Sequence, residues 1–359
     1  MNHYCTYFDR GFLVQGVALG RSLAAHDPGA VLWVLALDEE TEAMLRALGQ
    51  PDLRVVPLAE LEAADPGLAA AKANRTRVEY YFTLSPCWPR WLLAAHPEIG
   101  RVTYIDADMA FFAKPKPVFD AMDAAQASVL ITAHRFPGWQ RAHYERHGRY
   151  NVGILSFRND AAGRGCLEDW RTRCLAWCHD RLEDGKYADQ KYLDDWPARL
   201  GAALLVLDHP GVNLAPWNWL SQPCEVRDGA VLAGGRPLVL FHFARFRPLR
   251  GTWWWQSGQL DYGVMPWDLR NAIYGPYARA LVAARDELAA LFPGFDFPAR
   301  GARYGRAFWR SLPLRVVFGS DWLRVGGTFI SGRLGLGRFS GRCLALARGI
   351  FSGGPDASA

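Results

Sequence analysis

The first hundred residues alternate between short continuous apolar runs and segments in which apolar residues recur at helical spacing, a rhythm that few architectures accommodate. The strand-like runs are residues 2–8, 30–38, 53–58 and 101–106, and the helical segments lie near residues 12–23, 40–48 and 76–95. Apolar runs without polar alternation are typical of strands that are covered on both faces. The pattern therefore predicts an α/β fold with a mostly parallel central sheet flanked by helices.

The rest of the chain is less regular but still mixes the two kinds of element. Strands are expected at residues 128–136, 150–157, 203–208 and 237–243, and helices at residues 161–178 and 274–291. No internal repeat or low-complexity linker is found before the chain becomes rich in glycine and arginine near residue 300. We therefore expect one domain over residues 1–300 and a basic C-terminal tail over residues 301–359.

The net charge of +5 is concentrated in that tail, which holds nine arginines against two aspartates and leaves the other residues close to neutral. A body without a basic excess argues against a nucleic-acid partner bound in a basic groove. The tail interleaves arginine with aromatic and aliphatic residues, which suits peripheral contact with an anionic membrane surface. A flexible or packed tail is the alternative.

The amino terminus and the cysteines bear on the expected compartment. The sequence begins without a basic segment followed by an apolar one, and no apolar stretch reaches the roughly 18 to 20 residues that span a bilayer. Seven scattered cysteines, an odd number, fit reduced thiols, so a cytoplasmic protein is expected. Cys174, Cys178 and His179 fall on adjacent turns of an expected helix. They are interpreted as core residues, because the CxxC half-sites of structural zinc are missing.

The run RVTYIDADMAFF, residues 101–112, places Asp106 and Asp108 between two apolar segments. Residues two apart in an extended segment point the same way, so both carboxylates can face one ligand while Ala107 faces away. Ligands of parallel α/β sheets lie beyond the carboxyl ends of the strands. Two carboxylates at that place suit a hard divalent cation, Mn²⁺ or Mg²⁺, that is shared with a diphosphate, and a solvated turn is the alternative.

Five short motifs occur in an order that resembles a known family. CTYFD, YIDAD, YNVGILSF, ADQKYL and LFHF together resemble the GT-A glycosyltransferases, in particular the glycosyltransferase family 8 group that includes glycogenin and bacterial lipopolysaccharide galactosyltransferases. The resemblance runs from residue 2 to about residue 250. It implies a GT-A fold and metal-dependent transfer of a sugar from a nucleotide-diphosphate sugar, with UDP the expected nucleotide. The acceptor would be a saccharide or a lipid-linked molecule, and the anomeric configuration would be retained.

The resemblance also implies roles for individual residues. The metal ligands would be Asp106, Asp108 and His242, with Asp106 shared between the metal and the donor ribose. The donor would be held by Thr6, Tyr7, Phe8, Asp9, Phe12 and Gly153. The residues acting in catalysis would be Asn151, Asp189 and Gln190. Without the resemblance, a hydrogen-bonded histidine in an apolar strand would explain His242 equally well.

Two departures from the family pattern concern arginines that would bind the donor. The late family motif His-x-x-Gly-x-x-Lys-Pro reads HFARFRP here, so Arg245 or Arg247 would replace the lysine. A guanidinium suits this role because it binds phosphate oxygens in a bidentate manner. The family arginine in the helix before the aspartate pair is matched by Arg75 or Arg77, and Arg77 is favoured.

Aromatic and amide residues near residue 213 suit a sugar acceptor. The segment HPGVNLAPWNWL brings His209 near the expected site and contains the three residues expected to bind the acceptor, Asn213, Trp217 and Asn218. Ordinary loop packing is the alternative. The three tryptophans of GTWWWQ, residues 251–256, cannot all face one way, so at least one could be exposed for binding.

Two other functions stay open. A sugar nucleotidyltransferase would also use acidic metal ligands, but it would normally carry a Gly-rich phosphate loop with Lys or Arg after the first strand, where this chain reads TYFDRGF. A non-catalytic protein on the same fold would bind carbohydrate or nucleotide without metal and without turnover of a donor.

Overall fold

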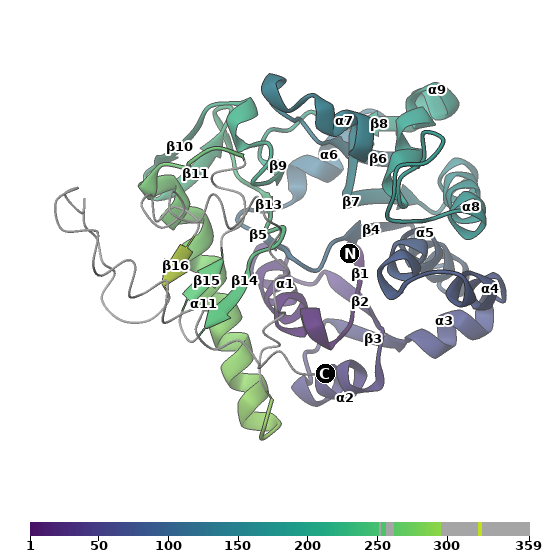
Figure 1. Cartoon of the computed structure of the whole chain (residues 1–359), viewed down its shortest axis with the longest axis horizontal. Helices are drawn as coiled ribbons and strands as arrows, with labels where there is room; N and C mark the ends of the chain where they lie inside the picture. Colours follow the sequence, from purple (N-terminus) through teal and green to yellow (C-terminus); the bar gives the residue numbers. More distant parts are fainter. Residues whose placement is uncertain (251–252, 256–261, 296–321, 325–359) are drawn as a thin grey trace, which may run out of the picture.

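A seven-stranded sheet organises the computed structural model, which describes residues 1–250, 253–255, 262–295 and 322–324 (Figure 1). The strands lie in the order β3 (Leu53–Pro57), β2 (Val31–Ala36), β1 (His3–Phe8), β4 (Arg101–Ile105), β7 (Tyr150–Arg158), β6 (Val129–Ala133) and β8 (Leu204–Val206). Six of these seven strands run in one direction, and β7 is inserted antiparallel between β4 and β6. The predicted α/β fold with a mostly parallel sheet is confirmed.

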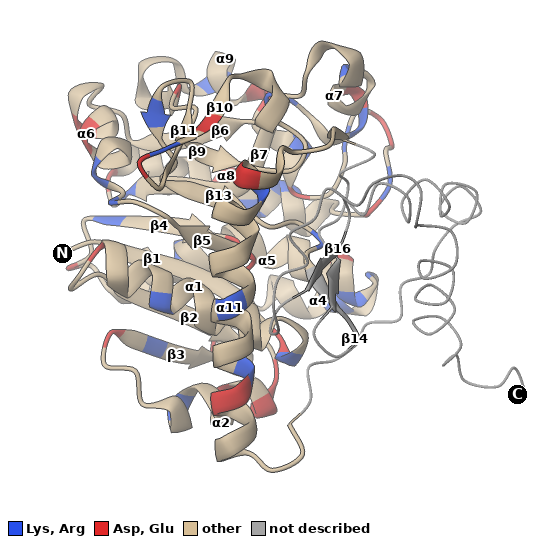
Figure 2. Cartoon of the chain, turned by 90° about the vertical axis from the view of Figure 1, so that its left-hand side faces the viewer, with Lys and Arg blue, Asp and Glu red and all other residues tan. Residues whose placement is uncertain are grey.

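Helices cover both faces of this sheet and enclose two hydrophobic cores (Figure 1). One core is covered by α3 (Leu58–Ala64), α4 (Gly67–Ala73), α5 (Arg77–Ala95), α8 (Ala161–Ala176) and α9 (Trp196–Leu200). The other is covered by α1 (Leu13–His26), α2 (Glu39–Leu48), α6 (Lys116–Ala124) and α11 (Trp267–Leu291). The strands between the cores carry few charges, and most Lys, Arg, Asp and Glu residues lie on helices and loops (Figure 2).

Local sequence explains where several helices begin. Asp38 accepts a backbone N–H at the start of α2, and Asp160 does the same at the start of α8. α5 begins with a capping box, in which Thr76 and Glu79 each accept a hydrogen bond from the other's backbone N–H. Such contacts satisfy the N–H groups that have no partner within the helix.

A second sheet of three short strands extends from the carboxyl end of β4. Its strands are β5 (Met109–Phe111), β13 (Leu240–His242) and β9 (Val212–Leu214). β13 pairs antiparallel with β5, so that His242 stands opposite Met109, and it pairs parallel with β9. Because β5 follows closely after β4, this pairing brings two distant segments of the chain to the end of β4.

The remaining elements lie around these two sheets. They are η1 (Arg10–Phe12), η2 (Gly138–Gln140), α7 (Ala142–His147), η3 (Gln190–Asp195), η4 (Gly201–Ala203), η5 (Trp219–Ser221), β10 (Cys224–Arg227), β11 (Ala230–Ala233), β12 (Arg236–Pro237), β14 (Arg247–Arg250), β15 (Trp253–Trp255) and β16 (Trp322–Arg324). Within the described ranges, no helix combines the length and the apolar character that crossing a bilayer requires.

Two predicted helices differ from the structure in extent. The helix expected from residue 274 begins at Trp267, because Leu269 and Ile273 extend its buried face by two turns. The helix expected to continue to residue 178 ends at Ala176, where Trp177 adopts an extended backbone. Cys178 and His179 therefore do not lie on turns of α8 as predicted.

The predicted tail is almost wholly outside the described residues. Residues 322–324 form β16, and the rest of 301–359 is not described, nor are residues 251, 252 and 256 of GTWWWQ. The domain boundary near residue 300 and a membrane contact of the tail therefore stay predictions.

Candidate active site

Polar side chains gather at the carboxyl edge of the seven-stranded sheet. β1, β4 and β6 end at this edge, and the antiparallel β7 begins there. Asp9, Asp106 and His134 directly follow the first three strands, and Asn151 lies at the start of β7. Since ligands of such sheets bind beyond this edge, the topology alone brings these residues to a binding position.

Asp106, Asp108 and His242 meet at this edge as a group that could hold a metal ion. Each offers a ligand atom that lies within 4.8 Å of the other two, and the described residues contain no second group of this kind. His242 Nε2 lies 3.2 Å from Asp108 Oδ1 and 3.7 Å from Asp106 Oδ2. The strand pairing explains this arrangement, because the Phe243 N–H donates to the Asp108 carbonyl at 2.8 Å and thereby holds the end of β13 against the aspartate loop.

Neighbouring charges shift the pKa values of Asp106 and His242. Burial raises the pKa of Asp106, His242 opposes this effect, and the carboxylate of Asp108 adds to it. Burial lowers the pKa of His242, but Asp108 and Asp106 outweigh burial and hold that pKa above its usual value. Tyr104 donates its hydroxyl to Asp106 Oδ1 at 2.7 Å. A cation bound here would favour the ionised form of both carboxylates and the neutral imidazole.

Close packing holds the His242 ring in place. The Trp217 ring lies against it edge to face, with the centroids 5.0 Å apart. Gly153 of β7 also lies close to the ring, because an added Cβ there would be 2.8 Å from His242 Nδ1 and 3.1 Å from Cε1. The glycine of YNVGILSF is therefore required because the imidazole occupies the space that a side chain would need.

A network of amides lies beside the three potential metal ligands. Asn151 Nδ2 donates to Gln190 Oε1 at 3.0 Å, and Asn151 Oδ1 accepts from the Gly153 N–H and from Asn213 Nδ2, both at 2.9 Å. Gln190 Nε2 in turn donates to the His147 carbonyl at 2.8 Å. The structure thus brings together Asn151 and Gln190, which were predicted to act in catalysis, and Asn213, which was predicted to bind the acceptor.

His134 and Thr132 complete this network, although the sequence analysis named neither. His134 Nδ1 lies 3.0 Å from the Gly148 carbonyl and must carry the proton, so Nε2 accepts from Asn151 Nδ2 at 3.3 Å. Burial lowers the pKa of His134 to about 3, so the ring is neutral. Thr132 accepts from Asn213 Nδ2 at 2.8 Å. Thr132 lies near the end of β6 and His134 directly follows this strand, which was predicted over residues 128–136. Their position at the carboxyl edge of the sheet is a signal by which both could have been found.

Asp189 is a buried carboxyl close to the potential metal site. Burial is the main cause that raises its pKa to about 7, a hydrogen bond from Ser85 lowers the pKa, and the charge of Asp106 raises it. Ser85, in the middle of α5, is also hydrogen-bonded to the Tyr7 hydroxyl at 2.9 Å. Nothing in the sequence singled out Ser85. A carboxyl that titrates near neutral pH beside a cluster of ligands is typical of functional sites.

The end of β1 is closed by residues of α5. Asp9 is 1% exposed, and its carboxylate accepts from the Gly11 N–H at 2.8 Å and from the Tyr81 hydroxyl at 3.3 Å, and also pairs with Arg77. The Arg77 side chain is 67% exposed, and its Nε donates to the Tyr81 hydroxyl at 2.7 Å. Thr6 and Phe8, which were also predicted to hold the donor, are buried. Tyr7 and Phe12, the other two residues predicted here, are partly exposed.

The two arginines proposed from the late motif lie beyond β13. Arg245 is exposed and has a positive φ of 64°. Burial, Arg146 and His143 lower the pKa of His147 to about 4, and the charge of Arg245 contributes to this lowering. Arg247 begins β14, and its side chain lies outside the described part of the chain.

The residues predicted to bind the acceptor are buried in the structure. Asn213 and Asn218 have no exposed surface, and Trp217 is 9% exposed. Asn218 accepts from the Ala215 N–H at 2.8 Å and donates to the carbonyls of His134 and Asn213 at 3.0 Å. The Asn218 amide therefore fixes the backbone conformation of residues 213–218. Direct contact of these residues with an acceptor stays a prediction.

Comparison with known proteins gives a family for this chain. No family model matches the sequence. It is 37% identical over 251 residues to the uncharacterized protein YfnF of Bacillus subtilis (strain 168), an alignment that covers 68% of this chain and 81% of YfnF. The chain belongs to the YfnF family. The uncharacterized protein YfnD of the same strain is 27% identical over 300 residues, which cover 82% of this chain and 93% of YfnD.

A solved structure is also similar to this member of the YfnF family. The galactosyltransferase LgtC, in complex with donor and acceptor sugar analogs, is 14% identical, with a TM-score of 0.49 and coverage of 78% of this chain and 95% of LgtC. LgtC is a glycosyltransferase, the class whose motifs this sequence resembles.

Proposed function

We propose that this protein is a metal-dependent glycosyltransferase that moves a sugar from a nucleotide-diphosphate sugar to an acceptor. The observation that carries the proposal is the meeting of Asp106, Asp108 and His242 at the carboxyl edge of the sheet. A solvated turn would explain the two aspartates alone. It does not explain a buried histidine whose Nε2 lies 3.2 Å from one of these carboxylates. The order of the five family motifs along the chain supports the same function.

The donor set at this position fits Mn²⁺ better than Mg²⁺. Both ions take carboxylate oxygens, whereas an imidazole ligand suits a transition metal and is unusual for Mg²⁺. Asp106, Asp108 and His242 would hold the ion. When bound, it would act as a Lewis acid that neutralises the diphosphate leaving group.

The chain's own residues would hold and orient the donor. Asp9 and Arg77 close the end of β1, where the nucleoside of a UDP-sugar is proposed to lie. Arg245, which is exposed in the turn that follows β13, is proposed to bind a diphosphate oxygen, because guanidinium contacts to phosphate are strong and directional. Gly153, also predicted to lie at the donor, lets the His242 ring and the Asn151 amide approach the backbone of β7 closely.

The sugar is proposed to lie between the metal ligands and the amide network. Asn151 and Gln190 are fixed by mutual hydrogen bonding and would orient sugar hydroxyls. Asp189, with a pKa of about 7, would accept a hydrogen bond from the sugar or stabilise the reacting centre when ionised. We propose transfer with retention to a saccharide or lipid-linked acceptor that approaches from the side of Asn213.

The test measures release of nucleoside diphosphate by the purified protein with Mn²⁺ and a panel of nucleotide sugars. We expect release from a UDP-sugar, and a loss on the order of 100- to 1,000-fold in Asp108→Asn, the range seen when one electrostatic group of an active site is removed. Asp120→Asn is the matched control, since this exposed carboxylate on α6 pairs with Lys116 and not with a residue of the site. The control should retain activity.

Two results would contradict the proposal. One is the absence of release from every donor together with the absence of any thermal shift with nucleotide and Mn²⁺, because a ligand that binds the folded state must stabilise it. The other is binding of nucleotide or sugar without release and without dependence on metal, which would indicate a non-catalytic binding protein. Formation of a nucleotide sugar with release of pyrophosphate would instead identify a nucleotidyltransferase.

A further inference from the structure

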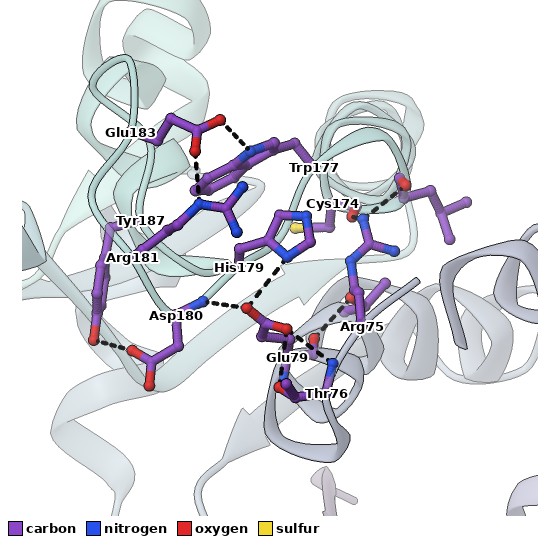
Figure 3. Close-up of polar contacts among 12 residues, drawn as sticks. Arg75, Thr76, Glu79, Cys174, Trp177, His179, Asp180, Arg181, Glu183 and Tyr187 are labelled. Carbon is purple, nitrogen blue, oxygen red and sulfur yellow. Dashed lines mark hydrogen bonds and ion pairs between the residues drawn. The ribbon is translucent and has the colours of Figure 1, made fainter. Parts of the chain in front are cut away.

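A loop that contributes no residue proposed to bind the metal or the donor leads directly to Asp189 in the proposed active site. Residues 177–188 leave the end of α8, form a compact excursion and return immediately before Asp189 (Figure 3). The neck of the loop is closed by the Ala188 N–H, which donates to the His179 carbonyl at 3.0 Å. Since Ala188 is the residue before Asp189, the position of the neck sets the position of this carboxyl.

Side chains within the loop tie its two halves together. Trp177 Nε1 donates to Glu183 Oε1 at 3.3 Å, and Arg181 Nε donates to Glu183 Oε2 at 2.6 Å. The Tyr187 hydroxyl donates to Asp180 Oδ1 at 2.7 Å, which connects the far half of the loop to its beginning (Figure 3). These hydrogen bonds join the two halves of the loop, so the loop stays in place or moves as a whole.

One carboxylate, that of Glu79, anchors this unit to the start of α5. Glu79 Oε1 accepts from the Asp180 N–H at 3.0 Å and lies 3.2 Å from His179 Nδ1 (Figure 3). Glu79 Oε2 accepts from the Thr76 N–H at 2.8 Å and from the Thr76 hydroxyl at 2.9 Å. A capping box needs only the second oxygen, so the first is left for the loop. Burial would raise the pKa of Glu79, but these contacts hold it at about 2.

The same end of α5 contacts both the base of the loop and the proposed donor site. Arg75 donates to the carbonyls of Cys174 and Leu175, both at 2.8 Å, at the end of the helix from which the loop departs. Two residues further along, Arg77 pairs with Asp9 at the end of β1. The start of α5 is thus a common support for the loop and for the nucleoside end of the site.

We propose that Glu79 is a positioning residue for the transfer reaction. Its contacts with His179 and Asp180 fix the loop, and the return of the loop fixes Asp189 and Gln190 at the site. This inference rests on the proposed function. A misplacement of about 1 Å at a reacting centre lowers the rate on the order of 100-fold. Loss of the anchor therefore lowers kcat, whereas KM for the donor changes little, because the nucleoside and diphosphate contacts proposed for Asp9, Arg77 and the metal ligands do not depend on the loop.

The experiment compares Glu79→Ala with Thr76→Ala in the full chain. Both remove a member of the capping box, but only Glu79→Ala also releases the loop. We expect kcat to fall roughly 10- to 100-fold in Glu79→Ala, with donor KM within about twofold of wild type. Thr76→Ala should keep the kcat of the wild type at a lower melting temperature. His179→Ala should lower kcat, and His179→Asn should restore it, because an asparagine amide can donate to Glu79 in place of Nδ1.

Hydrogen exchange of the backbone amides of residues 177–190 is measured in parallel, without substrate. Faster exchange in Glu79→Ala than in Thr76→Ala is expected. Two outcomes would overturn the positioning role. One is an equal kcat in all variants. The other is a fall in kcat that parallels the fall in melting temperature in both Glu79→Ala and Thr76→Ala. If the wild type transfers no sugar, the positioning role fails together with the proposed function. The exchange data would then still show whether Glu79 holds the loop, so the two failures are distinguishable.

Discussion

Replacing Gly153 by alanine should damage the proposed metal site without unfolding the protein. The new Cβ would lie 2.8 Å from His242 Nδ1 and 2.6 Å from Asn151 Oδ1. An unstrained contact needs about 3.5 Å, so the imidazole must move by roughly 0.7 Å. Metal sites tolerate only about 0.2 Å in ligand distance. We expect the affinity for Mn²⁺ to fall about 10- to 100-fold, as for other changes that disturb the support of a ligand, which is roughly 1.4–2.7 kcal/mol.

The assay is calorimetric titration with Mn²⁺, alongside urea unfolding. Overpacking of this kind lowers stability by about 1–3 kcal/mol, which a domain of this size can survive. Gly165→Ala is the control, because a Cβ at that exposed helical position meets no atom within 4 Å and should leave Mn²⁺ binding unchanged. Its stability should rise by about 0.4–1 kcal/mol. Binding of Mn²⁺ to Gly153→Ala with the affinity of the wild type would refute the assignment of His242 as a ligand.

Two further predictions concern stability. Between about pH 4 and 7 folded Asp189 keeps a proton that the unfolded chain has lost, so the metal-free protein loses stability as pH rises through this window. Asp189→Asn should therefore be more stable than the wild type at pH 8 by roughly 2–4 kcal/mol in urea unfolding, and equal stability there would contradict the raised pKa. The second concerns Asp65, which is 4% exposed and bound by Arg171 Nε at 2.6 Å. Asp65→Ala should cost about 3–5 kcal/mol, and a loss below about 1 kcal/mol would show that Arg171 finds another partner.

The fold and the aspartate pair could be predicted because each depends on residues that are close together in the sequence. The continuous apolar character of residues 30–38 identifies a strand covered on both faces, and β2 is buried along nearly its whole length. Asp106 and Asp108 directly follow such a strand. Their position at the carboxyl edge then follows from the topology of parallel sheets.

His242 could not be found from local pattern. It reaches Asp108 only because β13 pairs with β5, and neither strand is longer than three residues. Pairing between short strands that are distant in sequence leaves no periodic signal, so only the resemblance to a family indicated this residue. Ser85 is a similar case, since a serine in an apolar helix has no feature that reveals contact with Asp189.

The error over Cys178 and His179 has a different physical cause. Helical spacing from Cys174 was extended past the point where the chain leaves α8 at Trp177. Tertiary contacts end this helix, because the Trp177 carbonyl accepts from the Tyr192 hydroxyl at 2.6 Å and its indole reaches Glu183. Intrinsic helix propensity depends on local sequence and contains no information on tertiary contacts of this kind. Helix ends are therefore the least predictable part of the fold.

The pairing of β5 with β13 also determines when during synthesis a cation can first be bound. Asp108 is made well before His242, and more than 130 residues separate the two. At ribosomal rates of about 5–20 residues per second, the histidine follows the aspartates after a delay on the order of 10 s. During that interval the nascent chain carries two carboxylates without their imidazole partner. Fragments that end before residue 240, whether from interrupted translation or from proteolysis, should therefore be inactive even if the seven-stranded sheet has formed.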